Sequence, residues 1–167
     1  MARMTLKEFY LKQKEANRKR TNEVLGMLKP ENMTWKPADG ALNVGETLRH
    51  LWVSEERVRR VALENDFSYY ETRIPQGLGA VLGVPGTLAE ELANIERVHR
   101  DTLAAVATQP EEIFELERVN EKLGYRRKVS AILFGLNDHE IHHCAQLMTY
   151  LRMLGTPVAE PFQRPGK

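Results

Sequence analysis

The chain has 167 residues, of which 42% are apolar and 28% are charged, and these values are ordinary for one globular domain. Its 24 basic and 23 acidic residues leave a formal charge of +1, which gives no electrostatic basis for binding nucleic acid or an anionic membrane. The single cysteine excludes an internal disulfide, and the sequence contains neither a secretory signal nor the roughly 18 consecutive apolar residues that span a bilayer. We therefore expect a cytoplasmic protein with one domain over residues 1–167.

The first predicted helix spans residues 5–28, where apolar side chains such as Leu6 and Phe9 recur at helical spacing until a proline ends the pattern. This helix contains a basic run from Lys12 to Arg20. Because glutamates interrupt and flank the run, we interpret it as a solvated helix face and not as a DNA-binding arm.

A turn-rich segment, MTWKPADGAL, precedes the second predicted helix. Asn43 is expected to cap this helix, because Glu46 follows three residues later and completes a capping box. The apolar line of the helix continues from Val44 to Ala62. Residues 66–86 then lack a helical period, which predicts a flexible link or a lid over one end of the fold.

Two further helices are predicted, over residues 87–107 and 129–154. Between them, residues 112–128 alternate apolar and charged side chains, which favours a short hairpin or an extended crossing segment. Four long amphipathic segments with little strand signal predict an all-α protein, built as a four-helix bundle.

Three of the five histidines lie close together in the last helix, within the stretch NDHEIHHCAQLMTYLRMLG. A helical wheel places His139 and His143 one turn apart on the buried face, and it places His142 at the edge of that face. Two imidazoles at this spacing are about 5–6 Å apart at Cβ, which suits chelation of one metal ion. An uncoordinated buried pair would have to satisfy a donor and an acceptor on each ring. We therefore predict a metal-binding pair.

A third ligand is needed, and the two histidines elsewhere in the chain are candidates. His50 lies on one shoulder of the apolar stripe of the second helix, and His99 lies within the stripe of the third. Periodicity alone does not decide between them.

Residues 139–143 also match H-E-x-x-H, the zinc-peptidase motif in which the glutamate is the general base. A metzincin would have a third histidine six residues after His143, but that position is Thr149. No strand is predicted before the helix either, so a peptidase is the less favoured hypothesis. Glu140 is then expected at the surface or in support of the metal ligands.

Two segments together resemble the DinB-like (damage-inducible) family of four-helix-bundle metalloproteins. They are WKPADGALNVGETLRHLWVSEE, around His50, and the closing NDHEIHHCAQLMTYLRMLG. The resemblance implies His50, His139 and His143 as the metal ligands and leaves His99 as a core histidine. Where the family often has Arg-Gly or Arg-Ala before the glutamine, this chain has Cys144 and Ala145, and we expect the cysteine to be a half-buried bystander.

An open site with three histidines suits a divalent transition metal, with zinc or nickel expected, and leaves positions for water or substrate. The resemblance implies a small-molecule substrate, with a low-molecular-weight thiol as one candidate, and either thiol-dependent S-transfer or metal-activated hydrolysis. A non-catalytic, stress-associated metal-binding bundle is the alternative. The family also suggests a homodimer, for which we considered Trp52 as an exposed contact, and Tyr150 is a candidate pocket residue.

Overall fold

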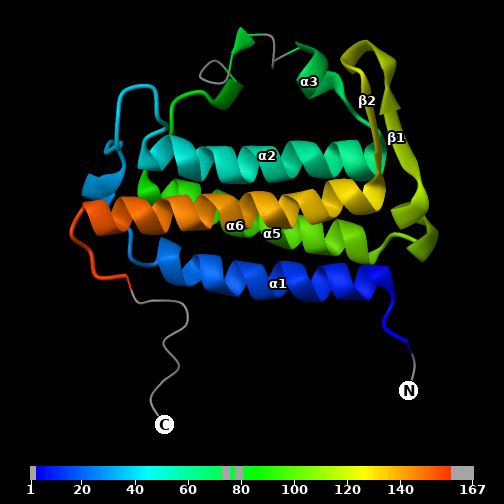
Figure 1. The fold of residues 1–167 in the computed structure, drawn as a ribbon, viewed down its shortest axis with the longest axis horizontal. Coiled ribbons are helices and arrows are strands. Elements are labelled where there is room, and N and C mark those ends of the chain that lie inside the picture. Colours follow the sequence, from blue (N-terminus) through cyan, green and yellow to red (C-terminus); the bar gives the residue numbers. More distant parts are fainter. Residues whose placement is uncertain (1–2, 73–75, 78–80, 159–167) are drawn as a thin grey trace.

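The computed structural model describes residues 3–72, 76–77 and 81–158. Four long helices dominate it, and 3-10 turns, short helical segments and a hairpin connect them (Figure 1). The helices and strands are α1 (Leu6–Leu25), α2 (Val44–Glu64), α3 (Ser68–Thr72), α5 (Leu88–Ala107), β1 (Glu117–Asn120), β2 (Tyr125–Lys128) and α6 (Val129–Met153). The predicted all-α bundle is confirmed.

Local sequence signals fix where the long helices begin and end. The capping box at Asn43 and Glu46 is confirmed, since the Asn43 side chain accepts from the Glu46 amide and the Glu46 carboxylate accepts from the Asn43 amide. Equivalent boxes open α1 and α5. At the other end of α2, Asn65 adopts the left-handed conformation with φ of 57°, which stops the helix.

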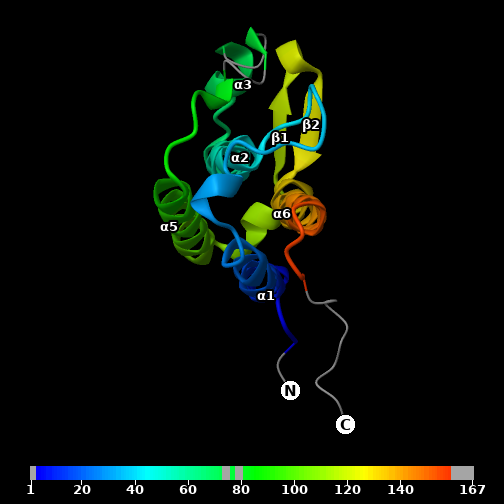
Figure 2. The ribbon, with the colours of Figure 1, turned by 90° about the vertical axis from the view of Figure 1, so that its left-hand side faces the viewer.

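The four long helices lie side by side, and α2 packs against both α5 and α6 while α1 packs against α6 and α5. The views in Figures 1 and 2 show α2 and α6 running alongside each other in opposite directions. The antiparallel hairpin of β1 and β2 pairs Glu117 with Lys128, so the segment before α6 is a hairpin, one of the two forms expected. The hairpin and α3 lie next to each other above α2 and α6, where the Asn120 amide donates to Glu71 (Figure 2).

Within the segment expected to be a link or a lid, the described part includes α3, and residues 73–75 and 78–80 lie outside the description. None of the described helices is long and apolar enough to cross a membrane.

The core consists of two hydrophobic clusters, with a polar layer between them along the bundle axis. One cluster, near the hairpin, includes Tyr10 and Leu136, and the other, near the opposite end, includes Leu25 and Leu147. Several buried polar side chains fall between these levels, on each of the four long helices. They include Lys14, Arg18, Glu55, His99 and Glu140.

The solvated face predicted for the basic run of α1 is wrong at two positions. Lys14 is 0% exposed and Arg18 is 4% exposed, whereas Leu6 and Phe9 of the expected apolar stripe are 38% and 43% exposed. The inner face of α1 is therefore largely polar. The charges are accommodated because two acidic side chains from other helices meet them in the core.

Candidate metal centre

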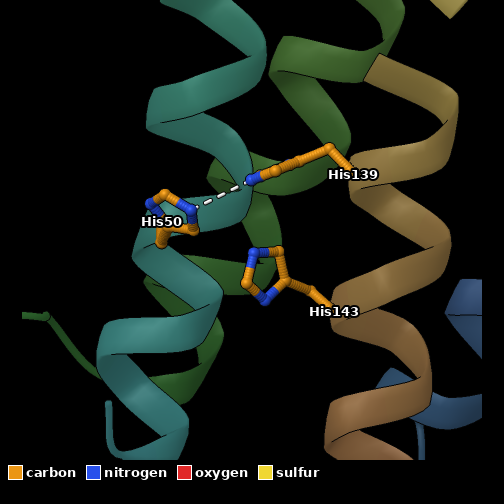
Figure 3. Close-up of side chains that lie close together, drawn as sticks. All are labelled: His50, His139 and His143. Atoms are coloured by element: carbon orange, nitrogen blue, oxygen red, sulfur yellow. Dashed lines mark hydrogen bonds between the residues drawn. The ribbon is translucent and has the colours of Figure 1, made fainter. Parts of the chain in front are cut away.

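Three histidines converge between α2 and α6, at the level of the polar layer. His50 projects from α2, and His139 and His143 project from successive turns of α6 (Figure 3). One ring nitrogen from each of the three lies within 4.8 Å of the others, and Nε2 of His139 is 2.9 Å from Nε2 of His50. We call these residues the histidine cluster.

The other histidines of the structure lie outside this cluster. His142 is exposed, as its edge position predicted, although its ring still touches that of His143. His99 is 5% exposed in the polar layer of the core, and its Nδ1 has no hydrogen-bond partner among the described residues. It is therefore a core histidine, as the resemblance implied, but one that is not fully satisfied.

Hydrogen bonds to the Nδ1 atoms of His143 and His50 orient these two rings of the cluster. Nδ1 of His143 lies 2.7 Å from Oε1 of Gln146, and an amide oxygen can only accept, so Nδ1 carries the proton and Nε2 presents a lone pair. The Gln146 amide in turn donates to the Tyr150 hydroxyl, which donates to the Leu42 carbonyl. The Ser54 hydroxyl lies 3.2 Å from Nδ1 of His50. Tyr150 therefore supports a ligand candidate from within the core, and it is not part of the wall of the cavity that reaches His50 and His139.

Burial keeps the three imidazoles neutral. Burial, followed by the charge of the neighbouring His143, lowers the pKa of His50 to about 4 and that of His139 to about 3. Burial also lowers the pKa of His143, against the opposing effect of its bond to Gln146. Neutral imidazole is the form that binds metals, so protons do not compete for these nitrogens near pH 7.

The donor set fits one divalent ion. Bonds of about 2.0–2.1 Å to a tetrahedral ion hold pairs of imidazole nitrogens roughly 3.3 Å apart, and the nitrogens of His50 and His139 already lie closer than that. Two Nε2 atoms facing each other across 2.9 Å can share one proton, whereas a cation can bind both lone pairs.

A buried ion cluster lies beside the histidine cluster, and the sequence reasoning missed most of it. Lys14 Nζ lies 2.8 Å from Glu140 Oε2 and 3.0 Å from Glu55 Oε2, and Arg18 Nη2 lies 3.0 Å from Glu55 Oε2 and 3.3 Å from Glu140 Oε2. Lys14 and Arg18 are four residues apart, on the same helical line as the buried Tyr10. That spacing was the available signal, because it places both cations on the face of Tyr10, but it does not show which acidic partners make their burial possible.

Glu140 is therefore neither a surface carboxylate nor placed as a peptidase base. Burial alone would raise its pKa, but the charges of Lys14 and Arg18 outweigh that effect and lower it. Both oxygens lie within ion-pair distance of these α1 cations, at 3.3 Å or less. The neighbouring Cys144 is half-buried, as expected, and burial raises the pKa of its thiol, which disfavours the thiolate.

A cavity of about 480 Å³ reaches the histidine cluster, where His50 and His139 form part of its wall. Trp52, considered as an exposed contact, is half-buried instead, and its indole donates to the buried Glu91 carboxylate at 2.7 Å. The expectation of an exposed apolar contact at this residue is wrong.

Comparison with known proteins supports the fold assignment over most of the chain. The DinB superfamily matches residues 13–147. The chain belongs to the DinB superfamily. No curated protein matches the sequence.

Three solved structures show how widely this DinB fold is shared. A DinB-like protein of Bacillus subtilis, YjoA, has a TM-score of 0.71 and 20% identity, with 94% of this chain and 99% of that chain covered. A DinB-like protein of Bacillus cereus has a TM-score of 0.72 and 17% identity, with coverages of 92% and 95%. YfiT of Bacillus subtilis, described as a probable metal-dependent hydrolase with an unusual four-helix bundle topology, has a TM-score of 0.67 and 15% identity, with coverages of 90% and 89%.

Proposed function

We propose that the protein is a metal-dependent hydrolase of small molecules, in which His50, His139 and His143 hold one divalent transition metal ion. The convergence of three neutral ring nitrogens within 4.8 Å is the observation that carries this proposal. Three protein ligands leave coordination positions open, which is the pattern of catalytic rather than structural zinc sites. Zinc or nickel suits such an all-imidazole donor set.

The chemistry that such an ion supplies when bound is Lewis-acid activation of water or a thiol at an open position. The protein's own contribution is to orient the ligands. Gln146 fixes which nitrogen of His143 presents a lone pair, and Ser54 supports the rear of the His50 ring. The description of YfiT as a probable metal-dependent hydrolase supports water as the nucleophile. Thiol transfer would use the same position, so one assay addresses both.

The first experiment measures metal content by mass spectrometry on untagged protein purified without added metal. We expect close to one equivalent of a transition metal per chain and its loss in His50→Ala. His99→Ala is the matched control, because this histidine also lies on a long helix but outside the cluster. Metal lost from His99→Ala and retained by His50→Ala would refute the ligand assignment.

Activity is then measured with ester and amide substrates, with and without a panel of thiols, on metal-loaded protein. Turnover that exceeds that of a His143→Ala variant and depends on the metal supports the enzymatic proposal. Stoichiometric metal without any such turnover would favour the non-catalytic metal-binding bundle. The homodimer and the cytoplasmic location stay predictions.

A further inference from the structure

The cavity beside the histidine cluster extends along the bundle toward the hairpin. One wall is the face of α2 that carries His50, Ser54 and Val58, and the opposite wall is α6. Residues of α3 and of the hairpin complete the lining at the far end, where Figure 2 shows the two elements above α2 and α6. The cavity therefore begins at the histidines and ends beneath the hairpin.

The spacing of the α6 residues gives the length of this cavity. Ala131, Gly135 and His139 follow one another at intervals of four residues, so they form one line along the helix. At 1.5 Å per residue, the distance from Ala131 to His139 is about 12 Å. A molecule that fills the cavity from the histidines to the hairpin is therefore elongated.

The middle of the cavity is apolar. Side chains of Val58, Phe67, Ile132 and Leu136 line it, and Tyr125 adds an aromatic ring. Among the described residues of the lining, no carboxylate is present. A ligand with a buried positive charge would find no counter-charge there, whereas an alkyl or aryl body would be removed from water.

One charged side chain, Arg127, lines the end remote from the histidines. Its guanidinium lies 5.9 Å from the centre of the Tyr125 ring and forms no ion pair with a described residue. The adjacent Arg126 differs, because it points to the other face of the hairpin and pairs with Glu117 at 2.8 Å. Arg127 is thus available to an anionic group of a ligand in the cavity.

Gly135 keeps the middle of the cavity wide. Glycine is unfavourable inside a helix, yet a Cβ placed on Gly135 would meet no atom within 4 Å. Helix packing therefore does not require glycine at this position. A side chain there would occupy space of the cavity itself.

From this wall chemistry we infer that the cavity binds an elongated small molecule with an apolar body and a carboxylate or similar anion at the end remote from the histidines. The body lies against the apolar walls, the anion pairs with Arg127, and the opposite end of the molecule reaches His50 and His139. The role of that opposite end as the reacting group rests on the proposed function. Binding of the body and the anion needs no metal.

The test is titration of the full chain with octanoate, octanol and acetate by calorimetry at pH 8, in metal-free and zinc-loaded forms. Octanoate has about the length of the cavity. Octanol has the same alkyl chain but no carboxylate, and acetate has the carboxylate but no long alkyl chain. We expect octanoate to bind the metal-free protein at least about tenfold more tightly than acetate, because its additional methylene groups leave water. We expect octanoate to bind only about two- to fivefold more tightly than octanol, because Arg127 is exposed and water weakens its pairing with the carboxylate.

Two matched pairs of variants locate the site. Both Ala131 and Ala145 are exposed on α6, but Ala131 lines the cavity and Ala145 does not. Ala131→Leu should therefore weaken octanoate binding about tenfold or more, while Ala145→Leu should leave it unchanged. Arg127→Gln should remove the preference of octanoate over octanol, and Arg126→Gln should keep it.

Equal binding of octanoate to wild type and Ala131→Leu would overturn the assignment of this cavity. A preference for octanoate that survives Arg127→Gln would overturn the role of Arg127. Both comparisons are measured on metal-free protein, so they remain valid even if the protein binds no metal. In the same way, a failure of octanoate to bind leaves the metal measurement untouched.

Discussion

Replacing Lys14 by methionine tests whether the buried ion cluster is a net-neutral unit that the fold depends on. Lys14 is 0% exposed, and its ammonium group lies within 3.0 Å of both Glu55 and Glu140. Methionine keeps most of the volume but removes the charge, which leaves two buried carboxylates facing the one guanidinium of Arg18. Removing one partner of a buried ion pair costs about 3–5 kcal/mol of stability. For a chain of this length we expect Tm to fall by about 6–20 °C.

Urea unfolding followed by circular dichroism measures this loss, and Lys12→Met is the matched control. Lys12 lies on the same helix and is exposed, so its replacement should change the free energy of unfolding by less than about 0.5 kcal/mol. Adding Glu140→Gln to Lys14→Met removes one of the uncompensated negative charges and should recover part of the stability. A loss below about 1 kcal/mol in Lys14→Met would refute the reasoning, because it would mean that water or relaxation already satisfies both carboxylates.

Two further predictions concern the polar layer and the cavity. Burial, followed by the charges of Arg18 and Lys14, lowers the pKa of His99 to about 4, so the folded protein keeps this ring neutral while the unfolded chain takes up a proton below about pH 6.5. The contribution of this group to stability is thus complete above pH 6.5 and is lost as pH falls toward 4. Between these pH values the free energy of unfolding of wild type should fall by up to about 3 kcal/mol relative to that of His99→Gln. A difference between the two proteins that does not change with pH would contradict this prediction. Gly135→Ala should raise the free energy of unfolding by roughly 1 kcal/mol, since nothing lies within 4 Å of the added Cβ, and a loss of stability in thermal melts would show that the helix needs glycine there.

The helices were predictable because their signals are local. The third helix was expected over residues 87–107 and is observed as Leu88–Ala107, and the last was expected over residues 129–154 and is observed as Val129–Met153. The relation of His139 to His143 is also local, because one helix fixes their separation and their common direction. Relations between residues one helical turn apart can be predicted from the sequence without knowing what packs against the helix.

Relations between helices were not accessible in this way. The choice between His50 and His99 depends on the rotation of α2 and α5 about their own axes relative to α6, which periodicity does not fix. The misreading of Lys14 has the same origin. A lysine in an apolar line reads as exposed until its partners are known, and the partners, Glu55 and Glu140, are separated from it by 41 and 126 residues, respectively.

These long-range relations explain why the ion cluster and the histidine cluster lie at one level of the bundle. Glu55 follows His50 on α2, and Glu140 lies between His139 and His143 on α6. The cations of α1 contact both carboxylates, so α1 joins the two helices on one side. On the other side the histidines face each other across the same pair of helices (Figure 3). Because a helix moves largely as one body, whatever fixes the spacing of Glu55 and Glu140 also fixes the spacing of the backbone positions that carry the three histidines. The polar layer, which weakens the hydrophobic core at its centre, thereby sets the separation of α2 and α6 at the histidine cluster before any ligand arrives, and the bond to Gln146 orients the ring of His143.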